Sequence, residues 1–447
     1  MSFDQSFSSR NMRRVWELQT RKGINLADFF GEVKKKQYLL REYRKQILDG
    51  KKKGKYSSEQ VKKAYKWIAE QKSDLDKEIN KALEQTSEKL ASLLTSQTFA
   101  WGLRYEGDRE GRPLYGIERT PEVYFADKQL QRNVSSATAS QQNSRSSAIS
   151  GLAQALNNDM PKMVVRTDIR SFYESISHDL LFDSMSRSSL SSTSRYLVEG
   201  LINEYAQITG RDVGLPMGVG VSSQLSELFI SQIDPLFKVQ ENVIYYARYV
   251  DDIVLVLGRD ANEKIVEPAE LRGMKSVLSE MNLSISENKT GWTSFPTAGK
   301  STVDFLGYTI SKEQKKGLKI CLSARRERLI LERLNRSFSA WEKYGPDNHG
   351  RRRLLIDRIK FLTGNTRLVN NKRNAMVGIY FSNPHLTDFE ALERLDKHLR
   401  SCMQQYNLPP DLRQKIEHMS FEKGFKERLF NRFSRKQLKE MKGAWNA

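Results

Sequence analysis

The sequence has few of the residues that cross-link a protein or bind zinc. Only two cysteines occur in its 447 residues, Cys321 and Cys402, and they are far apart. Their number and spacing predict neither a disulfide framework nor a zinc site, and they favour a reducing cytosol. The five histidines are scattered along the chain, and we interpret each as a surface or core residue.

Long apolar runs are also missing. No run approaches the length that a bilayer-spanning helix needs, and the first residues do not have the basic-then-apolar pattern of a signal peptide. We find no internal repeat and no nuclease, protease or maturase segment. The sequence therefore predicts a cytoplasmic protein without a membrane partner.

Acidic residues are fewer than basic ones. The chain has 74 Lys and Arg against 54 Asp and Glu, which gives a net charge of +20. Such a surplus suits a polyanionic partner, and the alternative is a merely soluble basic protein. At this length a single core would be unusual, so we expect two or three packed units.

Two adjacent acids interrupt an otherwise apolar stretch. Asp251 and Asp252 lie between runs at 244–249 and 253–257 that predict a strand hairpin. Buried and uncompensated, these carboxylates would be strongly destabilising. A polar turn explains the dipeptide taken alone. The alternative is a turn that faces a cleft, where the carboxylates hold divalent cations that remove the repulsion.

A third acid strengthens the interpretation as a metal site. Asp168 ends a short β-branched run that starts at Lys162, so its carboxylate is expected at the end of a second core strand. Three acids on two strand ends can hold two Mg²⁺ ions roughly 4 Å apart, an arrangement that activates a hydroxyl and stabilises a leaving phosphate oxygen.

This pattern resembles the reverse transcriptases, whose palm carries an Asp-bearing strand followed by a Tyr/Phe-X-Asp-Asp hairpin. Tyr249-Val250-Asp251-Asp252 matches that signature residue for residue. The resemblance implies an RNA-directed DNA polymerase, a nucleotidyltransferase of α+β class with the right-hand fold of fingers, antiparallel palm and helical thumb. It also implies that Asp168, Asp251 and Asp252 are catalytic and bind two Mg²⁺ ions.

Two later motifs follow in the order of the family. Lys289, in the stretch 284–290, corresponds to a lysine that can protonate the departing pyrophosphate. Phe305-Leu306-Gly307 matches the hairpin that grips the primer strand, where glycine permits a tight turn. The resemblance therefore adds one catalytic cation and a primer grip.

Nucleotide selection is expected after Asp168. Tyr173, five residues on, matches the position of a bulky side chain that would clash with a ribose 2′-hydroxyl, which favours deoxynucleotides. Packing in the core is the alternative for Tyr173 and the expectation for Phe172.

A glycine-rich loop resembles the family's Leu-Pro-Gln-Gly loop, which cradles the nascent base pair. Met217 and Gly218 are the expected nucleotide contacts, and glycine allows close backbone approach. Met217 stands where the family usually has Gln. This departure leaves open a polymerase that works without a template or primes from a protein hydroxyl.

Residues from about 101 to 160 favour turns and short strands, and the stretch 135–150 is rich in Ser, Thr, Gln and Asn. A disordered linker is one interpretation of that stretch. Its position before the Asp168 strand favours a fingers subdomain, where the family places cations on the incoming triphosphate. Lys128, Arg132 and Arg145 are the candidates.

The first hundred residues predict helices with many charges. Apolar residues recur at steps of three and four from Val61 to Leu93, which indicates a long helix. Ser57 with Gln60 predicts a capping box at its start, and Gly102 a stop. The lysine clusters fit either a solvated helix surface or contacts to a phosphate backbone.

Four parts are expected along the chain: a basic helical N-terminal extension at 1–104, fingers at 105–160, a palm at 161–310 and a helical thumb with a C-terminal tail at 311–447. An amphipathic helix is expected from Leu271 to Leu283 within the palm. Basic helices after Ser323 suit a thumb whose cations face a duplex backbone.

Among bacterial reverse transcriptases the chain most resembles the stand-alone, defence-associated antiviral enzymes, which are related to those of retrons and group II introns. The resemblance implies a non-coding RNA template, dNTP substrates, a DNA product and cytoplasmic antiviral defence. It leaves open whether the protein also binds a second reverse transcriptase or forms a homo-oligomer. A non-catalytic RNA-binding scaffold with the same fold is the remaining alternative.

Overall fold

The structure is a computed structural model that describes residues 3–109, 111–138, 144–259, 266–295, 300–313, 315–344, 349–368, 375–406 and 408–445. The chain divides into two compact units, each formed by two stretches: 1–140 with 171–232 (unit 1), and 141–170 with 233–447 (unit 2). The predicted boundaries of extension, fingers, palm and thumb stay a prediction.

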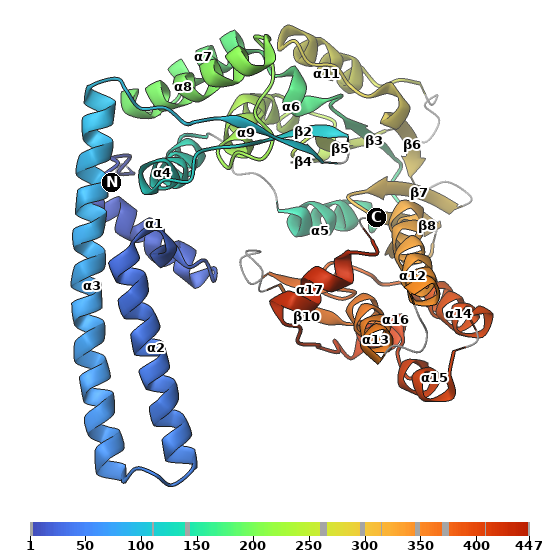
Figure 1. Cartoon of the computed structure of the whole chain (residues 1–447). Coiled ribbons are helices and arrows are strands. Elements are labelled where there is room, and N and C mark those ends of the chain that lie inside the picture. The colour runs from blue at the N-terminus through green and yellow to red at the C-terminus, as the bar shows by residue number, and fades with distance from the viewer. Residues whose placement is uncertain are drawn as a thin grey trace. The chain divides into compact units, whose positions relative to one another are not determined.

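Unit 1 begins with helices: α1 (Ser9–Arg21), the 3₁₀ helix η1 (Leu26–Phe29), α2 (Gly31–Lys52) and α3 (Ser58–Thr95). Figure 1 shows α2 and α3 side by side as a long hairpin. Most of the predicted apolar face of α3 is buried, from Val61 to Leu90, but Tyr65 remains 37% exposed. The long helix is confirmed, and its buried stripe explains why it forms.

The ends of α3 show one correct and one wrong prediction. Ser57 Oγ accepts from Gln60 N at 3.2 Å and Gln60 Oε1 accepts from Ser57 N at 2.8 Å, so the capping box is confirmed. The predicted stop at Gly102 is wrong, because the helix ends at Thr95. Gln97 has a φ of 55° and Thr98 N donates to Leu93 O at 3.0 Å, which closes the last turn earlier.

The rest of unit 1 combines a hairpin with short and medium helices: β1 (Arg104–Arg109), β2 (Arg112–Gly116), α4 (Pro121–Ala137), α6 (Phe172–Ser175), α7 (His178–Ser186), α8 (Ser192–Thr209) and α9 (Ser222–Ile230), with η2 (Ser231–Ile233) at its end. The prediction of short strands is confirmed at β1 and β2. It is wrong for residues 124–132, which lie in α4. Pro121 is at the start of α4, where proline is favoured. The burial of the apolar face of α4 outweighs the preference of these residues for turns.

Unit 2 is built on an antiparallel sheet in the order β4-β5-β3-β6. Its strands are β3 (Lys162–Asp168), β4 (Val243–Tyr249), β5 (Asp252–Gly258) and β6 (Gly291–Phe295). Residues 253–257 of β5 are at most 3% exposed, which explains their unbroken β-branched and leucine sequence. The two predicted hairpin strands are confirmed.

A second antiparallel sheet, in the order β7-β8-β9, contains β7 (Lys300–Phe305), β8 (Tyr308–Glu313) and β9 (Lys319–Leu322). A small pair is formed by β10 (Asn365–Arg367) and β11 (Met376–Gly378). The helices of unit 2 are α5 (Arg145–Leu156), α10 (Asp234–Lys238), α11 (Ala269–Glu280), η3 (Glu287–Lys289), α12 (Ala324–Tyr344), α13 (His349–Thr363), α14 (Glu390–Gln405), α15 (Pro410–Glu417), α16 (Phe421–Lys426) and α17 (Arg435–Lys442).

One apolar core runs through unit 2. It joins Val254 and Val256 of the first sheet, Phe305 of the second, and residues of α12–α16 such as Phe338 and Leu395. The predicted helix near 271–283 is confirmed as α11, and the predicted helices after Ser323 are confirmed. Helices occur together with antiparallel sheets, which is the predicted α+β class.

In the part of the chain that the structure describes, no helix is both long and apolar enough to cross a membrane. Cys321 and Cys402 are both free thiols.

Candidate active site

The three predicted catalytic aspartates lie at one end of the first sheet of unit 2. Asp168 is the last residue of β3, and it is paired directly with Asp252, the first residue of β5. Beyond this pair, Ile169 N donates to Asp251 O at 3.1 Å, which holds the turn residue beside the strand end. Backbone register therefore brings together acids from two distant stretches, as predicted.

These carboxylates form a negatively charged group that is partly withdrawn from water. Asp168 is 4% exposed, and its Oδ1 is buried without a hydrogen-bond partner among the described residues. The pKa of Asp252 is raised to about 6, first by burial, then by the charge of Asp251 and, more weakly, by that of Asp168. The cations of Arg166 and Lys289 oppose this rise.

Lys289 adds a cation to the group. Its Nζ donates to Oδ2 of Asp168, while 53% of its side chain remains exposed. The segment that carries it is fastened to β3, because Ser286 N donates to Asp168 O at 2.8 Å. The hydroxyls of Thr290 and Thr167 also form a hydrogen bond of 2.7 Å. The lysine is thus held at the acids by both backbone and side-chain contacts.

The donor chemistry of these residues fits a divalent cation. Carboxylate oxygens are the ligands that Mg²⁺ prefers, and a cation would relieve both the repulsion at Asp252 and the unpartnered Oδ1 of Asp168. Within the described ranges, however, no three His, Cys, Asp or Glu side chains are arranged so that they could hold a metal ion. Binding would therefore require the carboxylates to turn toward one another.

The turn that carries Asp251 is strained. Tyr249 pairs with Asp252, which leaves Val250 and Asp251 as a two-residue turn. Val250 has a φ of 60°, a left-handed conformation that is unfavourable for a β-branched residue. Such strain persists only where the surroundings fix the backbone.

A buried ion pair, which the sequence did not lead us to predict, supplies that restraint. Arg248 is 2% exposed, and its Nε and Nη2 donate to Oδ1 and Oδ2 of Asp234, each at 2.8 Å. The hydroxyl of Tyr246 donates to the same Oδ1 at 2.8 Å. Nη1 of Arg248 donates to Val250 O at 3.2 Å and so reaches the turn itself. The only sequence signal was an arginine inside an apolar strand.

The predicted primer-grip residues form a tight hairpin. Phe305 pairs with Tyr308, and both Leu306 (φ 47°) and Gly307 (φ 80°) have the positive φ of a type I′ turn. Arg145 holds this turn, because its Nε and Nη2 donate to Leu306 O at 3.0 and 2.7 Å. Its Nη1 donates to a second backbone carbonyl, at residue 382. The predicted contact of Arg145 with a triphosphate stays a prediction.

Lys128 and Arg132, the other two fingers candidates, lie on α4 in unit 1. Nζ of Lys128 pairs with Oδ2 of Asp127 at 2.8 Å, and only 18% of the lysine side chain is exposed. Nη1 of Arg132 donates to Gln129 Oε1 at 2.9 Å. Burial lowers the pKa of Arg132, and the charge of Arg14 lowers it further. Both cations are therefore engaged within unit 1.

The glycine-rich loop of unit 1 is fixed at both ends. Met217 O accepts from Tyr115 N at 2.7 Å, and Leu215 N donates to Tyr173 O at 2.9 Å. Gly218 has a φ of 105°, and a Cβ there would lie 2.5 Å from the carbonyl oxygen of Tyr115. Only glycine fits this close approach of two backbones. Three predicted nucleotide contacts thus meet at this loop: Met217 and Gly218 belong to it, and Tyr173 is joined to it by a backbone hydrogen bond.

Comparison with known protein families finds a match for the middle of the chain. Residues 122–310 match the family described as reverse transcriptase (RNA-dependent DNA polymerase), and this range contains the three aspartates and Lys289. No curated protein matches the chain.

Among solved structures, the chain is similar to fungal telomerases. Apo telomerase from Candida tropicalis truncated from its C-terminal domain has 12% identity and a TM-score of 0.36, over 49% of this chain and 54% of the other. Telomerase from Candida albicans, in complex with a fragment of telomeric RNA, has 12% identity and a TM-score of 0.34, over 66% and 56%. Apo telomerase from Candida tropicalis has 11% identity and a TM-score of 0.37, over 79% and 65%. The chain thus aligns with 54 to 65% of the length of these structures.

The predicted right-hand polymerase fold is confirmed. Residues 122–310 thus match the reverse transcriptase (RNA-dependent DNA polymerase) family, over less than half of the chain.

Proposed function

We propose that the chain copies RNA into DNA by two-metal nucleotidyl transfer. The observation that carries this proposal is the direct pairing of Asp168 with Asp252 at the end of β3 and β5, with Asp251 in the adjoining turn. Asp168, Asp251 and Asp252 would hold two Mg²⁺ ions, which supply activation of a 3′-hydroxyl and neutralise charge on the leaving pyrophosphate.

Other side chains of the domain have roles that follow from their chemistry. The ammonium of Lys289, half exposed and held by Asp168, is suited to protonate the leaving pyrophosphate. The ring of Tyr173 would exclude a ribose 2′-hydroxyl, and the backbone at Met217 and Gly218 would border the new base pair. Residues 305–307 would grip the primer, and Lys128, Arg132 and Arg145 are the proposed triphosphate contacts.

Primer extension on an RNA template tests this directly. With a DNA primer, dNTPs and Mg²⁺, the wild-type protein should extend the primer, and EDTA should stop the reaction. Asp168→Asn and Asp251→Asn should each lower the rate by about 1,000-fold, since that factor corresponds to roughly 4 kcal/mol of lost charge stabilisation.

A matched control separates catalysis from net charge. Asp411→Asn makes the same change at a half-exposed surface carboxylate of unit 2, which pairs with Arg352 at 3.5 Å. It should extend the primer at the wild-type rate. Equal activity in wild type and Asp251→Asn would refute metal-dependent catalysis at these aspartates.

Met217 favours a second candidate, a polymerase that extends DNA without a template or from a protein hydroxyl. Its main-chain oxygen is already bonded to Tyr115 N, and its thioether cannot make the hydrogen bonds of an amide. Product sequencing, with and without a defined RNA, distinguishes the two: complementary products support templated synthesis, and products that do not follow the RNA support the second candidate.

We further propose that this activity serves antiviral defence in the cytoplasm of a bacterium, with a non-coding RNA as template. The net charge of +20 supports an RNA partner, as do the lysine clusters at 34–36 and 51–53. Sequencing of nucleic acid that copurifies with the protein should identify one dominant RNA. Size measurement of the same preparation tests for a homo-oligomer or a second reverse transcriptase.

The biological role is tested by phage infection. Cells that express the wild-type protein and its RNA should be protected, and cells with Asp251→Ala should lose protection. Full protection by Asp251→Ala would instead support a non-catalytic RNA-binding scaffold.

A further inference from the structure

A cavity of about 720 Å³ lies in unit 2 between α12, α13 and the chain at the end of α17. None of its lining residues is a candidate for the polymerase chemistry. Its volume is in the range of sites that bind small molecules and cofactors. The cavity therefore needs an explanation of its own.

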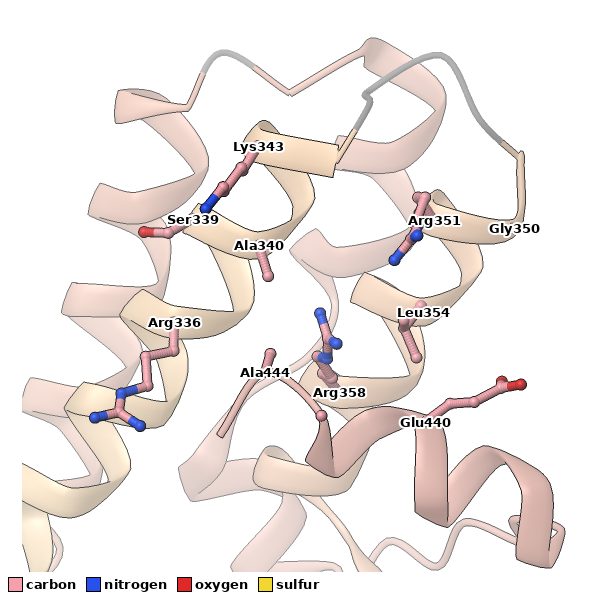
Figure 2. A pocket seen from close by; sticks show the side chains of 11 residues that line it. Arg336, Ser339, Ala340, Lys343, Gly350, Arg351, Leu354, Arg358, Glu440 and Ala444 are labelled. Carbon is pink, nitrogen blue, oxygen red and sulfur yellow. The ribbon is translucent and has the colours of Figure 1, made fainter. Parts of the chain in front are cut away.

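Positive charge dominates the lining. Arg336 and Lys343 come from α12, Arg351 and Arg358 from α13, and Glu440 is the one acid among the described lining residues. Figure 2 shows the guanidinium groups of Arg351 and Arg358 pointing into the space between the helices.

Glu440 does not pair with Arg358. In Figure 2 its carboxylate points away from Arg351 and Arg358. It lies 3.9 Å from the ammonium of Lys436, which is outside the cavity lining. Its charge is also not among those that shift the pKa of Arg358. Among the described lining residues, no acid thus neutralises Arg358.

Arg358 is the residue that most requires an anion. It is 5% exposed, and its Nε donates to Met441 O at 3.2 Å. Within the described residues no carboxylate forms an ion pair with it. Burial lowers its pKa, and the neighbouring charge of Arg351 lowers it further, so the guanidinium is held in an unfavourable environment. A buried cation without a counter-ion is strongly destabilising, which an incoming anion would relieve.

We propose that this cavity binds the polyphosphate group of a ligand. Guanidinium groups present a planar fork of donors that matches phosphate oxygens, and two of them facing one space suit a ligand with more than one phosphate. Ala340, Leu354 and Ala444 supply an apolar wall for an organic group attached to it. The ligand is either a free nucleotide or the 5′ end of an RNA strand, which share this chemistry.

Calorimetric titration with inorganic tripolyphosphate, in EDTA, tests the anion site without the metal chemistry of the aspartates. The wild-type protein should bind, and Arg351→Gln should weaken binding at least about tenfold, because one charge-assisted contact is lost. Arg351 is exposed, so its replacement leaves the core intact. Equal binding by wild type and Arg351→Gln would overturn the proposal.

Arg353→Gln is the matched control. This arginine is exposed on the same helix but does not line the cavity. Its replacement should change the affinity by less than about twofold, since it removes the same net charge at a distance from the ligand. A loss as large as that of Arg351→Gln would show a general effect of charge and refute a defined site.

Arg358→Lys adds a second, conservative probe. It keeps the buried charge and removes the fork, so binding of tripolyphosphate should weaken several-fold while the thermal midpoint stays close to that of the wild type. Unchanged affinity would contradict a role for Arg358.

Two ligands then separate the sources of the polyphosphate. ATP and a short RNA with a 5′-triphosphate are titrated in EDTA against wild type and Arg351→Gln, with the same RNA carrying a 5′-hydroxyl for comparison. Tighter, Arg351-dependent binding of ATP indicates a free nucleotide, and that of the 5′-triphosphate RNA indicates a strand end. Equal, Arg351-dependent binding of both RNAs would mean backbone contact and would overturn the proposal.

Discussion

At the residue scale, Asp252 shows how the proposed catalytic arrangement opposes folding. Its pKa rises from an ordinary value of 3.8 to about 6 through burial and two neighbouring acids. The folded protein therefore binds a proton more tightly at this site than the unfolded chain does. As the pH rises from about 4 to about 6, the proton is lost and the folded state becomes less stable. Above pH 6 the carboxylate is ionised in both states, and the full loss of folding free energy remains.

We predict that this loss is measurable in metal-free protein. In EDTA, the difference in unfolding free energy between Asp252→Asn and wild type should grow by roughly 1–3 kcal/mol between pH 4 and pH 7, since one pKa unit corresponds to about 1.4 kcal/mol. Urea unfolding at both pH values gives this difference. Added Mg²⁺ should reduce it, and a constant difference across the range would contradict the interpretation.

The pair of Arg248 and Asp234 is the second feature at this scale. Both side chains are almost fully buried, at 1% and 6% exposure, and the arginine reaches the strained turn at Val250. Removal of one partner would leave the other as an uncompensated buried charge. The pair could not be predicted, because the two residues are apart in the sequence and nothing near Asp234 indicates which cation it pairs with.

Asp234→Ala should therefore destabilise the protein by roughly 3–5 kcal/mol and reduce polymerase activity, since it frees the turn that carries Asp251. Asp411→Ala, at a half-exposed ion pair, should change stability by less than about 1 kcal/mol. Thermal unfolding and primer extension on both variants make the comparison. Similar losses in the two variants would show that the buried pair has no special role.

At the scale of elements, the sequence predicted hairpins and long helices best. The turns at Val250 and at Leu306-Gly307 lie between strands with clear apolar patterns, and α3 has a regular apolar stripe with a capping box. Helix α4 was missed because its turn-like composition is overridden by burial against other helices. The convergence of the three aspartates could be predicted from their places at strand ends together with the resemblance to reverse transcriptases. The register that pairs Asp168 with Asp252 could not be predicted, and the catalytic roles stay predictions.

The loop at Gly218 gives a prediction at this scale. Gly218→Ala should destabilise unit 1 by roughly 1–3 kcal/mol and lower nucleotide affinity, because a Cβ would collide with the Tyr115 carbonyl. Gly111→Ala is the control, since it also has a positive φ, 74°, but no atom within 4 Å of its Cβ position. Thermal unfolding should show the larger loss for Gly218→Ala. Equal losses would mean that φ alone, not the contact, sets the requirement for glycine.

At the scale of the whole molecule, the positive charge has a measurable consequence. Proteins that neutralise phosphates release counter-ions, so their affinity for nucleic acid falls steeply with salt. With a net charge of +20, we predict that affinity for RNA drops by roughly 1,000-fold between 50 and 200 mM salt. Fluorescence anisotropy over this range gives the slope. An affinity for RNA that does not change with salt concentration would exclude phosphate contacts as the main source of binding.

The length of the chain predicted two or three packed units, and the structure divides into two. The path of the chain could not be predicted, because each unit combines two separate stretches. Local patterns report local elements, whereas the pairing of distant stretches depends on packing that no single segment specifies.

The order β4-β5-β3-β6 makes β3 an internal strand with neighbours on both edges. Side chains alternate between the two faces of a strand, so one extra residue anywhere in 162–168 would shift its ladder by one step and turn the carboxylate at its end to the opposite face. The sheet could still form, yet the acids would no longer meet. Variation in this strand is therefore restricted in length even where several apolar side chains would pack equally well.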